Sequence, residues 1–341
     1  MSIARRDLVS CACTVVFLLS SAATSPAAAA DARSYVMKIS LATVNDPLHE
    51  FAKNYAAAVE NDSGGRIRTE IYPASQLGST QRQAEGVQFD QIQCLIVPPE
   101  FLVGIDERFE VLAAPDLVGS LAAGQRLVAE PVVHNLMLGL GADKGLHGVA
   151  LLVVGQSSVV SLIPLRRLAD FKGKKIRVFA SQFQALAIQR LGATPKPMTL
   201  GEVLPALQDN AIDGALSSIT VFATMHYWHA AKYVTDIHQP AIFGIGEISK
   251  KWYDSLPPDL QQVIDKDAAA AAAAVTPWTV DFNAAARKTW TDNGGELISL
   301  LPDEQVTLHE ALASVGADAS KSDPSLNAAY RIVTEAAQRI H

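Results

Sequence analysis

The sequence predicts an α/β fold of two domains. Strand, amphipathic helix and strand follow one another between residues 36 and 72, and again between residues 175 and 218. Between these two units, residues 148–154 form a continuous apolar run that is typical of a buried strand. Apolar residues make up 49% of the chain. Its length is therefore enough for two hydrophobic cores.

The first half of the chain begins with a strand that Asn45-Asp46-Pro47 interrupts, and Gly64-Gly65 ends the helix that follows it. Two parallel strands joined by a helix predict a parallel sheet here. The expected elements are strands at 36–42, 67–72, 95–97 and 148–154, and helices at 48–62, 80–88 and 123–138.

Residues 172–218 contain the most informative unit. A short strand at 175–179 carries one charge, Arg177, and a helix at 182–191 ends at Gly192. A second helix begins at Thr199, with Glu202 three residues later, which is a capping-box pattern. The strand at 214–218 ends in two serines. Open α/β sheets bind ligands at such strand ends, so a ligand site is expected here.

Arg177 lies between Ile176 and Val178 and cannot give up its charge. Two interpretations stay open. A nearby carboxylate could pair with the guanidinium at a solvated strand end. Alternatively, the planar guanidinium holds the carboxylate of a ligand through two parallel hydrogen bonds.

In the second half, residues 219–236 are helical in pattern and rich in aromatic residues, and 241–248 form a strand that returns to the first domain. One long helix is expected over 255–290, beginning at Pro257-Pro258 after a Ser255 cap, and Pro277 should kink or split it. Two shorter helices follow at 303–316 and 325–339. The predicted domains are 31–154 with 243–282, and 155–242 with 283–341, so the chain crosses between them several times.

Residues 1–30 have the features of an export signal. Arg5 and Arg6 precede an apolar core, and Ala28-Ala29-Ala30 fits the cleavage pattern. A transmembrane anchor is the alternative, but its apolar core is short and is interrupted by serines and Pro26. We expect an exported, periplasmic protein with no membrane insertion after cleavage. The signal fits both the general and the twin-arginine export route.

Removal of residues 1–30 leaves 26 of the 28 basic and 34 of the 35 acidic residues, a formal charge of −8. Such a charge argues against nucleic acid and anionic lipid as partners. Cys11 and Cys13 leave with the signal, so Cys94 has no disulfide partner within the mature chain.

The sequence contains no dinucleotide-binding loop, no phosphate loop and no nucleophile elbow, so these motifs do not indicate an enzyme. His226 and His229 are three residues apart, but no further metal-ligand motif surrounds them, so neither a metal nor another cofactor is predicted. The aromatic residues at 222–233 favour core packing, with Phe222 the best candidate for a pocket wall because it closely follows the strand-end serines.

Several segments resemble the DctP-type extracytoplasmic solute-binding proteins of TRAP (tripartite ATP-independent periplasmic) transporters. They occur in the family's order and cover nearly the whole mature chain: ENDSGGRIRTEIYPASQLGS (60–79), EGVQ (85–88), DFKGKKIRV (170–178), PKPMTLGEVLPALQ (195–208), DGA (213–215) and KKWYDSLPPDLQQVI (250–264). The resemblance implies a type II-like periplasmic binding protein: two α/β domains joined by hinge strands and a long helix, with the ligand cleft between them. It also implies that Arg177 forms a salt bridge with a substrate carboxylate.

The chain departs from the family pattern at three places. Ser157 stands where many members have a second arginine, Ser217 stands in place of an asparagine, and Leu200 in place of a phenylalanine. One fixed charge with more room predicts a monocarboxylate that has an apolar or aromatic body. The predicted ligand contacts are Arg177, Ser157, Ser158, Ser217, Ser218, Leu200 and Phe222, joined from the first domain by Asn45, Gln81 and the turn at 95–99.

A ligand that touches both domains would favour a closed state, which would dock on the TRAP permease in the membrane and release the organic acid. The alternative is a ligand-sensing protein read by a membrane signalling receptor, because both functions need a cleft and a docking face. Neighbouring permease genes would favour transport, and a neighbouring sensor kinase would favour sensing. An enzyme would need a reactive group beside Arg177, and turnover of a bound acid by the purified protein would reveal it.

Overall fold

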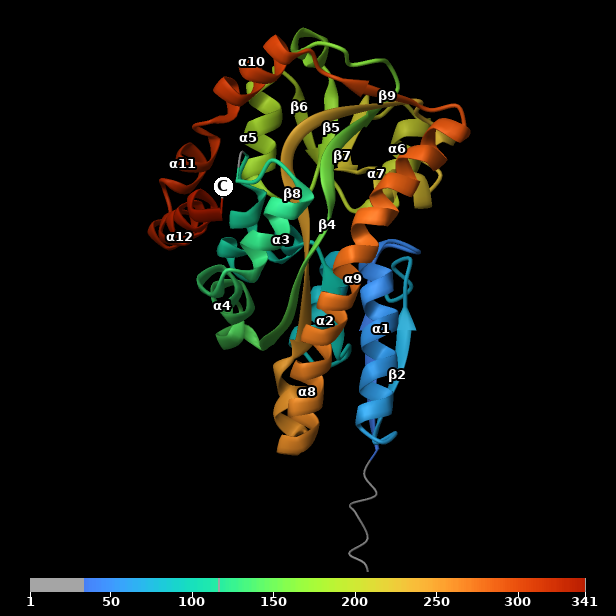
Figure 1. The fold of residues 1–341 in the computed structure, drawn as a ribbon, viewed down its shortest axis with the longest axis vertical. Coiled ribbons are helices and arrows are strands. Elements are labelled where there is room, and N and C mark those ends of the chain that lie inside the picture. The colour runs from blue at the N-terminus through green and yellow to red at the C-terminus, as the bar shows by residue number, and fades with distance from the viewer. Residues whose placement is uncertain (1–33, 116, 341) are drawn as a thin grey trace, which may run out of the picture. The chain divides into compact units, whose positions relative to one another are not determined.

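The computed structural model describes residues 34–115 and 117–340, and the side chains of 238–240 are not described (Figure 1). The predicted export signal at 1–30 lies outside the described residues. The described part forms one nine-stranded mixed sheet in the order β2-β1-β3-β8-β4-β7-β5-β6, with β9 paired to β8. The strands are β1 (Tyr35–Ser40), β2 (Ile67–Tyr72), β3 (Cys94–Val97), β4 (Leu146–Ser161), β5 (Lys175–Val178), β6 (Thr194–Pro197), β7 (Gly214–Ser218), β8 (Tyr233–Ser249) and β9 (Glu296–Ser299).

Two long antiparallel strands, β4 and β8, connect two groups of shorter strands (Figure 1). Residues 245–248 of β8 pair with β3, which continues to β1 and β2. At the other end, β9 pairs with residues 233–236 of β8, and β7 pairs with residues 157–161 of β4. The β4–β8 register shifts between Val153 and Gly155 and again on either side of Ser157, where the two groups meet. The sheet therefore has its irregular pairing in the middle of its two longest strands.

The α/β prediction is confirmed, and several boundaries differ. The expected strands at 148–154 and 241–248 are only parts of β4 and β8. Their continuations were hidden because buried serines and aromatic residues break the apolar pattern. Short strands β6 and β9 were not expected, since β6 is an exposed edge strand and β9 is four residues long. The remaining strands lie at or within two residues of the expected positions.

The helices are α1 (Pro47–Asp62), α2 (Thr80–Gln88), α3 (Leu121–Ala129), α4 (Pro131–Gly139), α5 (Gln182–Arg190), α6 (Leu200–Gln208), α7 (Ile219–Thr224), α8 (Lys250–Ser255), α9 (Pro258–Asp292), α10 (Pro302–Leu312), α11 (Val315–Ser320) and α12 (Pro324–Ile340). The expected helix at 123–138 is two helices, because Pro131 starts a new one. The expected helix at 219–236 ends after α7, since His226 takes the left-handed conformation (φ 56°) before β8 begins.

α9 continues through Pro277 as one helix, so of the two expected effects of this proline, a kink or a split, the split is wrong. Side chains on both sides of the proline, Val275 and Thr279 among them, are buried, and α9 packs against α1, α7 and β4. Burial along its length holds the helix together where one backbone hydrogen bond is missing. Its N-cap is Pro257, whereas Ser255 ends α8, which corrects the predicted cap. The expected helix at 303–316 is divided into α10 and α11.

Helices cover both faces of the sheet. α1 and α9 lie side by side along one face, and α3 and α4 pack against β4 (Figure 1). The C-terminal helix α12 packs on α3, on α4 and on the 3-10 helix Glu107–Ala113. None of the helices in 34–115 and 117–340 is long and apolar enough to cross a membrane.

Candidate functional site

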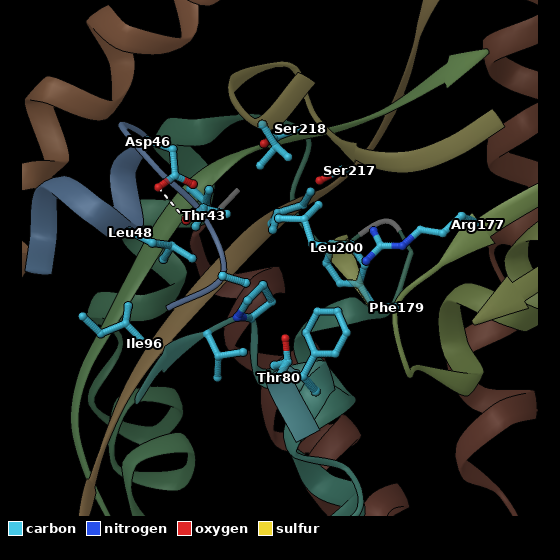
Figure 2. A pocket seen from close by; sticks show the side chains of 17 residues that line it. Thr43, Asp46, Leu48, Thr80, Ile96, Arg177, Phe179, Leu200, Ser217 and Ser218 are labelled. Atoms are coloured by element: carbon cyan, nitrogen blue, oxygen red, sulfur yellow. Dashed lines mark hydrogen bonds between the residues drawn. The ribbon is translucent and has the colours of Figure 1, made fainter. Parts of the chain in front are cut away.

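A narrow cavity of about 30 Å³ lies at the point where the two strand groups meet (Figure 2). Its 17 lining residues are mostly apolar. The apolar ones are Ala42, Leu48, Ile96, Val97, Pro98, Phe101, Val154, Phe179, Leu200, Val221 and Ile242, and the polar ones are Thr43, Asp46, Thr80, Arg177, Ser217 and Ser218.

Arg177 is the only basic side chain in this wall, and it is 1% exposed. Its Nε donates to the Met198 carbonyl and its Nη1 to the Leu216 carbonyl, both at 3.0 Å. The guanidinium carbon lies 4.6 Å from the ring centroid of Phe179 and 6.0 Å from that of Phe101. These two rings stack on each other with centroids 5.2 Å apart. The guanidinium is therefore held by carbonyls and aromatic faces.

No carboxylate of the described residues lies within salt-bridge distance of Arg177. Burial lowers the pKa of its guanidinium to about 10, which leaves it charged at neutral pH. Glu100 and Glu202 act on that pKa only through space. Of the two interpretations of Arg177, the local ion pair is thus not found, and a buried cation faces the cavity without a carboxylate paired to it.

The strand ends that the sequence singled out come together here. β5 and β7 are parallel neighbours, with Arg177 opposite Ala215 in the ladder, so the carboxyl end of β7 lies beside the guanidinium. Ser217 and Ser218 end β7, are almost fully buried and line the cavity. The Ser218 hydroxyl also shares a 2.6 Å hydrogen bond with the Thr220 hydroxyl. Leu200, the first residue of α6, covers the wall between them and the guanidinium (Figure 2).

The β1–β3 group supplies the other wall. Asp46 caps α1, and its Oδ1 accepts hydrogen bonds from the Thr43 hydroxyl (2.8 Å) and the His49 amide (3.0 Å). Its Oδ2 is buried and has no hydrogen-bond partner. Burial raises the pKa of this carboxyl to about 6, so it is ionised at neutral pH. A buried cation and a buried anion therefore lie on different walls of one cavity (Figure 2).

The family comparison decides what kind of protein this is. The model of bacterial extracellular solute-binding protein family 7, DctP, matches residues 40–322. The chain belongs to this family. Family 7 proteins are solute-binding components of transporters and not enzymes, as the sequence predicted.

Named relatives and solved structures agree with the family 7 assignment. The C4-dicarboxylate-binding periplasmic protein DctP of Rhodobacter capsulatus is 26% identical over 290 residues, covering 83% of this chain and 86% of the relative. A TRAP periplasmic solute-binding protein from Desulfovibrio salexigens, solved with orotic acid, superposes with a TM-score of 0.85 at 21% identity, covering 90% of this chain and all of that one. The sugar acid binding protein of Advenella mimigardefordensis, solved with galactonate, has a TM-score of 0.86 at 20% identity, with 91% and 99% covered. These two structures establish the shared fold.

Four of the individually predicted contacts line the cavity of this family 7 protein: Arg177, Leu200, Ser217 and Ser218. Ile96, Val97 and Pro98 of the predicted turn at 95–99 line it as well. The other predicted residues lie elsewhere. Ser157 lines a second hollow together with Glu100 and Gln184, and Ser158 lies opposite Ser217 in the β4–β7 ladder. Asn45 and Gln81 each line a further hollow.

Phe222 is fully buried in the core, where it packs against Tyr227 and Trp290. Successive residues of a helix point about 100° apart, so Val221 and not Phe222 faces the cavity. His226 and His229 lie with ring centroids 6.2 Å apart, and no group of three metal-ligating side chains occurs in the described part of the chain.

Sequence reasoning missed Asp46, Phe101 and Phe179 as cavity residues. Asp46 carried a recognisable signal, since an acidic residue before Pro47 is a typical helix cap. Phe101 and Phe179 follow the ends of β3 and β5, where ligand sites gather, but a single aromatic residue at a strand end is too common to be informative.

Proposed function

We propose that this protein captures an organic acid in the cavity by closing around it and delivers the acid to the membrane permease of a TRAP transporter. The observation that carries the proposal is Arg177, a buried guanidinium that faces the cavity and has no carboxylate partner. Keeping an unpaired charge buried is unfavourable unless a ligand supplies its counter-ion. The family and the predicted signal at 1–30 support export to the periplasm.

The ligand is a monocarboxylate with an apolar or aromatic body. One basic side chain supports one carboxylate, and 11 of the 17 lining residues are apolar. The stacked rings of Phe101 and Phe179 offer an aromatic surface beside the guanidinium. The structural neighbours bind both kinds of acid: orotic acid has a flat ring, and galactonate is polyhydroxylated.

Closure would act through β4 and β8. The ligand would touch Arg177 and Ser217 from one strand group, and Thr43 and Phe101 from the other, so only a closed state satisfies both. The register shifts around Gly155 give these strands a place to bend. Domains of 31–154 with 243–282, and 155–242 with 283–341, agree with a hinge there, except that α12 packs on α3 and α4 of the first domain.

A thermal-shift screen of residues 31–341 tests the proposal. Each acid is paired with its neutral carboxamide, over aromatic, aliphatic, keto, sugar and dicarboxylic acids. A monocarboxylate at about 100 times its Kd should stabilise the protein by about 2.7 kcal/mol, while its carboxamide should not. Stabilisation by carboxamides as strongly as by acids would overturn the carboxylate assignment. Stabilisation by sugar acids or dicarboxylates alone would overturn only the apolar monocarboxylate.

A further inference from the structure

Building on the proposed function, we propose that Asp46 is the second polar anchor of the ligand. The acid held by Arg177 then carries a hydroxyl or another neutral hydrogen-bond donor at the end remote from its carboxylate. Asp46 thereby determines which monocarboxylates bind, and it acts from the opposite strand group.

The geometry of Asp46 leaves one oxygen for this role. Oδ1 is used twice, by the Thr43 hydroxyl and by the His49 amide that begins α1. Oδ2 is buried, has no partner and belongs to a side chain that is 0% exposed and lines the cavity. Two hydrogen bonds on Oδ1 fix the carboxylate, so it cannot readily turn Oδ2 toward solvent. A fixed and buried acceptor in the cavity wall is suited to receive a hydrogen bond from a donor on the ligand.

Its position relative to Arg177 sets the order of groups in the ligand. Figure 2 shows Asp46 and Arg177 on opposite sides of the cavity, with Leu200 and Ser217 between them. The residues between the two charged groups are mainly apolar, so the middle of the ligand has few polar partners. The matching molecule has a carboxylate, an apolar body and a donor in that order.

The chemistry of the anchor also excludes a class of ligand. An ionised carboxylate accepts hydrogen bonds and donates none. A second carboxylate on the ligand would therefore meet a like charge at Asp46, and the burial of Asp46 weakens the screening of that repulsion. An acid without a donor would leave Oδ2 unpaired, which is unfavourable for a buried charged acceptor. A hydroxy acid avoids both penalties.

Matched pairs of acids measure this preference. Phenylacetate, phenylpropionate and hexanoate are each compared with the derivative that bears a hydroxyl at the far end, by calorimetric titration. In at least one pair the hydroxy acid should bind the wild-type protein about 10- to 100-fold more tightly than its parent. Equal affinities within every pair that binds would overturn the proposal.

Asp46→Asn is the decisive variant. Asparagine is also a good helix cap, so α1 should keep its start, while a neutral amide replaces the charged acceptor and so weakens any hydrogen bond from the ligand hydroxyl. The hydroxy-acid preference should fall to threefold or less, and the parent acids should bind as before. Asp46→Ser, which keeps a capping hydroxyl too short to reach the ligand, should lose the preference in the same way. A preference retained in both variants would refute the role of Asp46.

Asp106→Asn is the matched control. Asp106 also caps a helix, by accepting from the Arg108 amide at 3.0 Å, but it does not line the cavity. Asp106→Asn should keep the full hydroxy-acid preference. A loss of that preference in Asp106→Asn would count against the role of Asp46. The two proposals fail separately. If carboxamides bind as well as acids, the proposed function and this inference both fail. If acids bind without regard to the hydroxyl, only this inference fails.

Discussion

Replacing Arg177 with methionine separates a ligand-binding arginine from a structural one. Methionine keeps an unbranched chain of similar length and removes the charge. In the free protein, two opposing effects follow. Burial lowers the pKa of the guanidinium from 12.5 to about 10, which corresponds to an unfavourable free energy of about 3 kcal/mol for the buried charge. That penalty disappears in the variant.

The variant also loses favourable contacts. The two hydrogen bonds to the Met198 and Leu216 carbonyls contribute about 1.5–3 kcal/mol each at most, and the contact with the Phe179 ring about 1–2 kcal/mol. Methionine recovers part of the latter through its sulfur. The lost contacts sum to about 4–8 kcal/mol and the relieved burial to about 3 kcal/mol, so we expect the free energy of unfolding of Arg177→Met to fall by about 1–5 kcal/mol.

Ligand binding should respond quite differently. The variant offers the ligand carboxylate no counter-charge in a desolvated site, and truncating one partner of such a pair costs about 2–5 kcal/mol. The Kd of the best monocarboxylate should therefore rise by at least about 100-fold. Urea denaturation without ligand gives the stability, and calorimetric titration gives the Kd.

Arg190→Met is the control for arginine removal. Arg190 lies on α5, is largely exposed and pairs with Asp318 at 2.7 Å, outside the cavity. Its removal should change the Kd less than threefold. The reasoning is refuted if Arg177→Met binds the acid within fivefold of the wild-type affinity. A loss of stability well above about 5 kcal/mol would show that the guanidinium is mainly structural.

Three further predictions concern neighbouring groups. Burial raises the pKa of Glu100 to about 8, so the folded protein keeps a proton that the unfolded chain releases. The free energy of unfolding should therefore fall as the pH rises from about 5 to about 8. Urea denaturation should show a smaller fall in Glu100→Gln. Equal slopes would contradict this. Phe101→Ala should weaken the binding of aromatic acids about tenfold and the binding of hexanoate less, as measured by calorimetric titration. Equal losses of affinity would argue against stacking on this ring. Buried Glu110 accepts hydrogen bonds from the Ser181 hydroxyl (2.8 Å) and the Gln182 amide (2.7 Å). Glu110→Ala should therefore lower the free energy of unfolding by about 2–4 kcal/mol. A loss below about 1 kcal/mol would show that these bonds matter little.

The sequence by itself determined the elements whose signals are local. β2, α2 and β7 have the predicted bounds, because turn residues or caps mark their ends and a periodic pattern fills them. The capping box at Thr199 and Glu202 is present as expected. Arg177 was identifiable as unusual from its neighbours alone, since an unpaired charge is rare in an apolar strand.

Only the tertiary structure decided which residues meet. The full lengths of β4 and β8 depend on their pairing with each other, which no local pattern encodes across buried serines. Whether a carboxylate pairs with Arg177 depends on all the elements that pack around it, so the sequence of one strand could not reveal it. The same holds for Asp46, whose capping hydrogen bond is a local feature, while the cavity that its side chain lines is made by distant residues. Secondary structure follows from contacts a few residues apart, but a binding site is formed by contacts between strands far apart in the chain.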